Sequence, residues 1–195
     1  MQPKKRELIE LVRRVQKGNL EAFGVIYDGF FDSVYAYVFR QVRSHANTED
    51  IVSQVFLDAF EKIGAFRWRG AGFAAWLFRI ARNDVLDDFR RRGVRAREVA
   101  LSEVVIEQLP AKFSVEDEME RMWDEQELLD AIDCLSEDQR QVMLLKLMLD
   151  FTNKQIAEVI DKNEGAVKAL RRRALLSLRR ILEGQETRPQ TRTER

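Results

Sequence analysis

The residues from which metal sites, disulfides and nucleophilic triads are built are almost absent from this sequence. Its 195 residues include one cysteine, Cys134, and one histidine, His45. A single cysteine excludes a disulfide within the chain, and a structural zinc site needs about four Cys or His ligands. A Ser-His-Asp triad would depend on His45, which lies in the polar stretch RSHANTED and is predicted to be solvent-exposed. We expect Cys134 to pack as a small apolar side chain.

Turn-forming residues and long apolar runs are also scarce. The chain has 9 glycines and 3 prolines, which favours long helices over turn-rich β structure. The longest apolar stretch, VMLLKLML, contains Lys146 and is too short to cross a bilayer. The N-terminal stretch MQPKKRELIELVRRVQKG lacks the uninterrupted apolar core of a signal peptide. We therefore predict a cytoplasmic protein without membrane insertion.

The chain also has no net charge, because 33 basic residues balance 33 acidic ones. The basic and the acidic residues nevertheless gather in different parts of the sequence. The stretch NEGAVKALRRRALLSLRR at 163–180 contains six basic residues and one acidic residue. Between Glu98 and Glu127, ten acidic residues stand against Lys112 and Arg121. This acidic stretch includes a proline and has no sustained period, which is typical of a linker between folded units.

These patterns predict an all-α protein of two small helical domains joined by a flexible acidic linker. The predicted segments are an N-terminal domain at 1–93, the linker and the start of a helix at 94–125, a C-terminal domain at 126–184 and a disordered tail at 185–195. Within the linker, helix is expected to resume near Val115.

Residues 5–92 show helical periodicity throughout. Apolar positions in TEDIVSQVFLDAFEKI recur at helical spacing and predict one buried stripe, formed by Val52, Phe56, Ala59 and Ile63. Asn47 or Thr48 is expected to cap this helix. The preceding stretch EAFGVIYDGFFDSVYAYVFRQV predicts an aromatic helix with a break near Gly29. The stretch GFAAWLFRIARNDVLDDFRRRG predicts a later helix that ends at Gly93.

The C-terminal domain has the signals of a helix–turn–helix. Ser136 with Gln139, and Thr152 with Gln155, have the spacing of capping boxes, and Asn163 is suited to cap the long basic helix. Asp161 lies where the turn needs a left-handed residue, a conformation that Asp tolerates better than most residues. One face of the basic helix is apolar and is expected to pack inward: Val167, Leu170, Ala174, Leu178 and Ile181.

The other face of this helix carries Lys168, Arg172 and Arg179. A helix–turn–helix presents the N-terminal half of its second helix to the major groove, where Arg and Lys read guanine edges or hold phosphates. We predict that this face binds DNA. The alternative interpretation is an amphipathic helix whose charged face is only solvated.

A second basic patch lies on the predicted helix that ends at Gly93 and on the loop before it. Four polar residues spaced four, four and three apart share one helix face: Arg79, Asn83, Asp87 and Arg90. The loop contains Arg67, Trp68 and Arg69, residue types that suit an unstacked base. Trp76 is expected in the core, and for Trp68 the core and the base-binding interpretations both stay open. Asp87 and Asp88 diverge on the helix and do not form an acid–base pair, and the chain has no glycine-rich phosphate loop.

Three ordered stretches resemble the extracytoplasmic-function class of bacterial sigma-70 family sigma factors. They are TEDIVSQVFLDAFEKIGAF, GFAAWLFRIARNDVLDDFRRR and LSEDQRQVMLLKLMLDFTNKQIAEVIDKNEGAVKALRRRALLSLRRIL. The resemblance covers the chain from about residue 20 to residue 183. It implies a factor that is not an enzyme, has no cofactor or metal, and directs core RNA polymerase to promoter DNA.

The resemblance also implies roles for individual residues. Core polymerase would be bound by the polar side of the 47–63 helix, through Asp50, Gln54 and Asp58; the residues alone indicate only a solvated face there. The −10 element would be contacted by Arg67, Trp68, Arg69, Arg79, Asn83, Asp87 and Arg90. The −35 element would be contacted by Glu164, Lys168, Arg171 and Arg172. The chain departs from the family in having Ser53 and Gln54 where a Gln and an acid are usual, and Asp161 where Gly is usual.

In this family a separate anti-sigma factor commonly clamps both domains. The resemblance therefore implies such a partner for this chain. We expect a monomer that samples several interdomain arrangements when free, of which the anti-sigma partner fixes one with the DNA-binding faces hidden. The competing interpretations are a two-domain helix–turn–helix regulator that does not engage polymerase and a helical enzyme.

Overall fold

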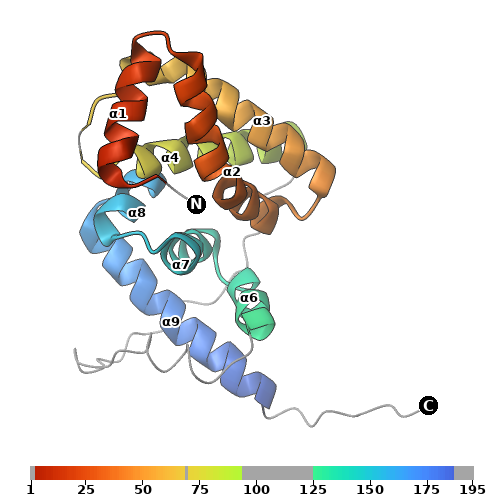
Figure 1. The fold of residues 1–195 in the computed structure, drawn as a ribbon. Helices are drawn as coiled ribbons and strands as arrows, with labels where there is room; N and C mark the ends of the chain where they lie inside the picture. The colour runs from red at the N-terminus through yellow and green to blue at the C-terminus, as the bar shows by residue number, and fades with distance from the viewer. Residues whose placement is uncertain (1–2, 69, 94–124, 187–195) are drawn as a thin grey trace.

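The computed structural model describes residues 3–68, 70–93 and 125–186, and within them it is helical with no strand, as predicted (Figure 1). The elements follow in the order α1 (Lys5–Gln16), α2 (Leu20–Val42), α3 (His45–Lys62), the 3₁₀ turn η1 (Ile63–Ala65), α4 (Gly72–Arg91), α6 (Glu125–Asp133), α7 (Glu137–Leu149), α8 (Asn153–Ile160) and α9 (Glu164–Glu186). The predicted linker, its helical restart near Val115 and most of the predicted tail lie outside the described residues.

Helices α1 to α4 form the N-terminal lobe. The predicted stripe on α3 is confirmed, because Val52, Phe56, Ala59 and Ile63 are all buried. The predicted break near Gly29 is wrong, since α2 runs without interruption from Leu20 to Val42. One glycine inside a helix costs only about 1 kcal/mol. Burial of five large side chains along α2 outweighs that cost: Ile26, Phe30, Val34, Tyr37 and Val38.

The start of α3 also differs from the prediction. The helix begins at His45, and the cap is Ser44, whose side chain accepts a bond from the Asn47 amide. Thr48 instead turns its hydroxyl back to the Ser44 carbonyl, 2.8 Å away, and is buried. Because α3 starts earlier than expected, Asp50 lies beyond its first turn.

Helices α6 to α9 form the C-terminal lobe, in which α8, a tight turn and α9 make the predicted helix–turn–helix. Asp161 adopts the left-handed conformation with φ 55°. The capping box of Thr152 with Gln155 is present, and Asn163 Oδ1 accepts from the Ala166 amide at 2.8 Å. The capping box expected at Ser136 is not formed, since Ser136 makes no side-chain cap bond. Its neighbour Glu137 is bonded to other side chains of α7.

The apolar face of α9 packs inward as predicted. Val167, Ala174 and Leu178 are fully buried, and Leu170 and Ile181 pack against the core from partly buried positions. Ala157 on α8 is buried at the crossing of the two helices, where its small side chain permits their close approach.

One apolar cluster spans both lobes, and a second lies within the C-terminal lobe, between α6, α7 and α9. Helix α8 lies against α4 and α7 lies against α2 (Figure 1). At the centre, the ring of Phe78 on α4 is fully buried and stands edge-on to two other rings. One is Tyr37 on α2, with 5.3 Å between centroids, and the other is Phe151 between α7 and α8, with 5.5 Å. Apolar burial of this kind stabilises the contact of the lobes as it stabilises a single domain.

Candidate nucleic-acid interface

The N-terminal half of α9 presents a polar face to solvent. Glu164, Lys168 and Arg172 are exposed, as their predicted role on DNA requires. Arg171 is half-buried, and its Nη1 lies 3.4 Å from Asn153 Oδ1 at the start of α8. The spacing along the helix explains this difference, because Arg171 lies four positions after Val167 and three before Ala174, which are both buried.

The second face lies along α4. Arg79, Asn83, Asp87 and Arg90 are all exposed, while the residues expected to face the core are buried, namely Phe73, Leu77 and Ile80. Asp87 and Arg90 form an ion pair of 2.7 Å. An exposed pair of this kind contributes about 1 kcal/mol or less, so both side chains remain available to a ligand.

The aromatic residues in and after the loop before α4 pack on one another. Trp68 is half-buried and stands edge-on to Phe66 at 5.3 Å. Its indole Nε1 is buried and has no hydrogen-bond partner among the described residues. Trp76, expected in the core, is partly buried and packs on Phe66 at 5.0 Å. Packing of Trp68 on the core therefore accounts for most of its ring.

The cations of the loop are placed differently. The Arg67 guanidinium is exposed and donates to the carbonyls of Gly64 and Phe66, at 3.1 and 2.9 Å. Arg69 lies outside the described residues. A pocket of about 260 Å³ opens beside Arg67, and it is lined by Ala65, Phe66, Arg67, Gly70, Trp76, Arg79 and, from the C-terminal lobe, Glu158.

The polar side of α3 is exposed at Asp50 and Gln54, whereas Asp58 is half-buried. Gln54 Nε2 donates to Asp58 Oδ1 at 2.6 Å. The hydrogen bond from Lys62 holds the pKa of the Asp58 carboxyl below its usual range, and the Gln54 bond adds to this effect. Asp58 is therefore an ionised, internally bonded carboxylate, and Asp50 is the freer acid of this face.

Sequence reasoning missed an apolar patch next to this polar face. Leu57 is 50% exposed and Phe60 39% exposed. Phe60 also stands edge-on to Phe23 of α2, with 5.0 Å between ring centroids. Exposed apolar side chains grouped beside polar ones mark interaction surfaces. The available signal was the presence of large apolar residues outside the buried stripe of α3.

A groove of about 820 Å³ runs between α3 and the C-terminal half of α4. Its lining is acidic with a basic end and comprises Asp50, Ile51, Gln54, Asp58, Asp84, Asp87, Asp88, Arg90, Arg91 and Arg92. Asp88 is buried and accepts from Arg92 at 2.9 Å. Burial raises the pKa of the Asp84 carboxyl to about 6, and the nearby Asp58 carboxylate adds to this shift.

The raised pKa of Asp84 predicts that the free energy of unfolding depends on pH. Its folded pKa lies above its ordinary value of 3.8, so the folded state holds the proton more tightly than the unfolded state and stability falls as pH rises from about 4 to about 6. At pH 7 the free energy of unfolding of Asp84→Asn should exceed that of the wild type by about 1 kcal/mol, after allowance for solvent screening. Near pH 4 the two free energies should be equal. Urea titrations across this range measure the difference. Asp32→Asn, an exposed change on α2, is the control. An equal advantage at both pH values would contradict the assignment.

The remaining residues considered for chemistry, His45 and Cys134, both lie on the surface. Among the described residues, no group of three or more His, Cys, Asp and Glu side chains is placed to hold a metal ion. His45 is exposed, as predicted, and it bonds Tyr35 at 2.7 Å and stacks on Phe39. Cys134 is exposed, so the expectation that it packs internally is wrong: it follows the last turn of α6, outside the apolar face of that helix. In the part of the chain that the structure describes, no helix is long and apolar enough to span a membrane.

Comparison with known proteins bears directly on the two polar faces. The model of sigma-70 region 2 matches residues 26–95 and the model of sigma-70 region 4 matches residues 125–178. The sequence is 30% identical over 165 residues to the ECF RNA polymerase sigma-E factor of Haemophilus influenzae, covering 82% of this chain and 86% of that protein. The chain belongs to the extracytoplasmic-function sigma factors of the sigma-70 family.

Two further relatives show how far the likeness extends. This sigma factor is 38% identical over 175 residues to the ECF RNA polymerase sigma factor BldN of Streptomyces coelicolor, which covers 90% of this chain and 66% of that protein. It also shares its fold with the sigma factor RpoE of Bartonella quintana, solved in complex with the anti-sigma factor NepR. That likeness has a TM-score of 0.57 and 23% identity, and covers 92% of this chain and 96% of that one.

The family explains why each lobe has its own polar helix face. The region 2 match contains α4 and the loop before it, and the region 4 match contains α8 and most of α9. The helices predicted to contact the −10 element and the −35 element, α4 and α9, therefore lie in separate lobes. The residues between the two matches lie outside the described residues.

Proposed function

We propose that this sigma factor binds core RNA polymerase through α3 and directs it to promoters through α4 and α9. The observation that supports this best is that each sigma-70 region falls mainly within one lobe, and that α4 in one lobe and α9 in the other each expose a polar face. Two separate faces suit two separate promoter elements, read as duplex DNA at −35 and as opened strand at −10.

At the −35 element, Lys168 and Arg172 hold phosphates or read guanine edges in the major groove, with Glu164 one turn before them. Their exposure on the N-terminal half of α9 supports this role. Arg171 positions α9 against α8 through Asn153. Its contribution to DNA binding is therefore indirect, by holding the recognition helix at its angle.

At the −10 element, the exposed face of α4 contacts the DNA through Arg79, Asn83, Asp87 and Arg90. The loop at 66–72 receives an unstacked base, for which Arg67 and Arg69 supply positive charge. The packing of Trp68 on Phe66 supports a role for its ring in shaping this loop.

Core polymerase binds the polar side of α3, where Asp50 and Gln54 are exposed and Asp58 holds Gln54 in place. The neighbouring Leu57 and Phe60 supply apolar area that polar side chains alone lack. This combination fits a partner surface with basic residues around an apolar ridge.

An anti-sigma factor is the proposed regulatory partner, and the free protein is proposed to be a monomer located in the cytoplasm. The support for the partner is the shared fold with a sigma factor solved in complex with its anti-sigma factor. Such a partner would compete for the exposed apolar and acidic side chains of α3.

The test is in vitro transcription with purified core polymerase on a promoter library, together with the affinity for core. Asp50→Arg should weaken core binding about tenfold or more, because it reverses an exposed charge in the proposed interface. Glu10→Arg on α1 makes the same charge change on an exposed residue outside it and should bind normally. Equal affinities for both variants would remove Asp50 from the interface. Duplex DNA binding without any core-dependent initiation would replace the proposal with a conventional DNA-binding regulator.

A further inference from the structure

One side chain of the C-terminal lobe reaches into the loop that we assign to the −10 element. Glu158 lies on α8, which is the first helix of the helix–turn–helix. Its Oε2 accepts a hydrogen bond from the Ala71 amide at 3.0 Å, and Ala71 immediately precedes α4. The same carboxylate lines the pocket that also contains Arg67 and Arg79. An acidic group of one lobe thus occupies a basic site of the other.

The local backbone is shaped to admit this carboxylate. Gly70 has φ +60°, and a Cβ atom at that position would lie 2.5 Å from Glu158 Oε2. A residue without a side chain therefore stands where the carboxylate approaches, in a conformation that glycine adopts readily. The approach of Glu158 is consequently a close fit between backbone and carboxylate.

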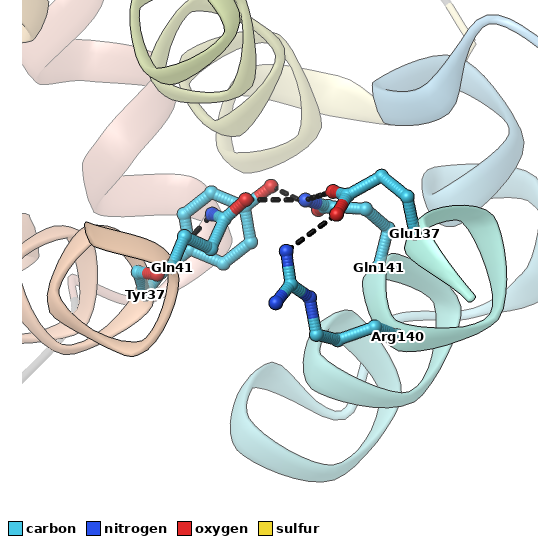
Figure 2. A network of polar contacts seen from close by, with 5 residues as sticks. All are labelled: Tyr37, Gln41, Glu137, Arg140 and Gln141. Carbon is cyan, nitrogen blue, oxygen red and sulfur yellow. Dashed lines mark hydrogen bonds and ion pairs between the residues drawn. The ribbon is translucent and has the colours of Figure 1, made fainter. Parts of the chain in front are cut away.

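Buried polar contacts fix the same arrangement of the lobes at a second place (Figure 2). The Tyr37 hydroxyl on α2 donates to Gln141 Oε1 on α7 at 2.5 Å. The Gln141 amide donates in turn to Gln41 on α2 and to Glu137. Burial raises the pKa of Tyr37 above its usual range, so its hydroxyl stays a neutral donor. Directional bonds of this kind specify one register between α2 and α7, and that register sets where α8 places Glu158.

We propose that this sigma factor is closed by an internal contact in the loop before α4, in which Glu158 competes with promoter DNA for the Ala71 amide and for the pocket beside Arg67. The inference rests on the proposed function of that loop. A carboxylate and a DNA phosphate are both anions that accept from backbone amides and arginines. The Ala71 amide and the pocket beside Arg67 cannot serve both at once, so DNA enters only when α8 leaves α4.

The closed arrangement leaves the other surfaces accessible. Asp50 and Gln54 on α3 are exposed in it, and so are Lys168 and Arg172 on α9. Core polymerase can therefore engage α3 while the loop is still covered. Separation of α8 from α4 then becomes the step that makes the −10 loop available, and any partner that holds α8 on α4 keeps it covered.

The experiment compares three full-length variants with the wild type, using fluorescent single-stranded DNA of degenerate sequence about 12 nucleotides long. Glu158→Ala removes the competitor and should bind this probe about tenfold more tightly, the factor expected for loss of a charge-assisted hydrogen bond. Glu158→Gln keeps an acceptor oxygen without the charge and should show a smaller gain. Glu10→Gln, an exposed change on α1, alters net charge equally and should bind as the wild type does.

A distance measurement tests the closure itself. Spin labels on the exposed Cys134 and on Lys17→Cys, directly after α1, report on the two lobes. Against the expectation of several arrangements in the free protein, the distance distribution should be narrow in the wild type. Glu158→Ala should add a component at longer distances, while the apolar core shared by the lobes holds the other molecules closed. Equal DNA affinities for all variants, gains shared by Glu10→Gln, or an unchanged distance distribution would each overturn the inference. Failure of core-dependent transcription by the wild type would count against the proposed function instead, and the distances would still report whether Glu158 closes the lobes.

Discussion

Phe78→Ala should lower the free energy of unfolding by about 3–5 kcal/mol, the range for removing a fully buried aromatic side chain. Phe78 has 0% of its surface exposed. It packs at nearly right angles on Tyr37 and Phe151, with interplanar angles of 83° and 86°. Each such pair adds about 0.5–1.5 kcal/mol beyond burial. The loss is expected to be large because the cavity would open between α2, α4 and the connection of α7 to α8, which belong to both lobes.

Urea denaturation followed by circular dichroism measures this effect, with Phe60→Ala as the matched control. Phe60 is 39% exposed, so the same truncation there should cost about 1 kcal/mol or less. Equal losses at the two positions would show that the core does not continue through Phe78. A loss confined to one of two separate transitions would show that the lobes unfold independently.

Gln141→Leu should destabilise the protein by about 1–3 kcal/mol, because it leaves buried polar atoms without partners. Gln141 is 1% exposed and Tyr37 is 0% exposed. The substitution removes the acceptor of the Tyr37 hydroxyl, 2.5 Å away, and the donor to Glu137 Oε1, 2.8 Å away. The size of the side chain is nearly conserved, so the cost arises from unpaired groups and not from a cavity.

A double-mutant cycle separates these causes. Tyr37→Phe removes the hydroxyl that Gln141→Leu would leave unpaired. The double variant should therefore lose less stability than the sum of the two single variants, with a coupling of about 1 kcal/mol. The control pair is Tyr37→Phe with Gln54→Leu, since Gln54 is exposed on α3 and should be additive with it. Additive losses at Tyr37 and Gln141 would mean that the bond contributes nothing to the contact of the lobes.

Local signals in the sequence predicted the elements where a few neighbouring residues decide the outcome. The capping box at Thr152 and the left-handed turn at Asp161 both form, because each depends on contacts within about four residues. The break expected near Gly29 and the cap expected at Asn47 or Thr48 do not occur. Near Gly29, packing of the α2 face outweighs the local preference. At the start of α3 a different local signal decides, because the Ser44 side chain forms the cap.

The candidate faces were predicted for the same local reason. Helical spacing alone places Arg79, Asn83, Asp87 and Arg90 on one side of α4, and their exposure agrees with it. Spacing does not predict how far a side chain is covered by another helix. Arg171 is half-buried against α8, and the Trp68 ring is largely used in packing on Phe66.

By itself, the sequence determined the helical class, the two polar helix faces and the family, since periodicity, caps and motifs are properties of neighbouring residues. The tertiary structure decided how the two lobes meet. Glu158 and Ala71 are 87 positions apart in the chain, and Tyr37 and Gln141 are 104 apart. No periodicity or composition relates residues at such separations. Only the packing of α8 on α4 and of α7 on α2 brings them within hydrogen-bond distance. The contact of Glu158 with the loop before α4 could therefore be found only from the tertiary structure.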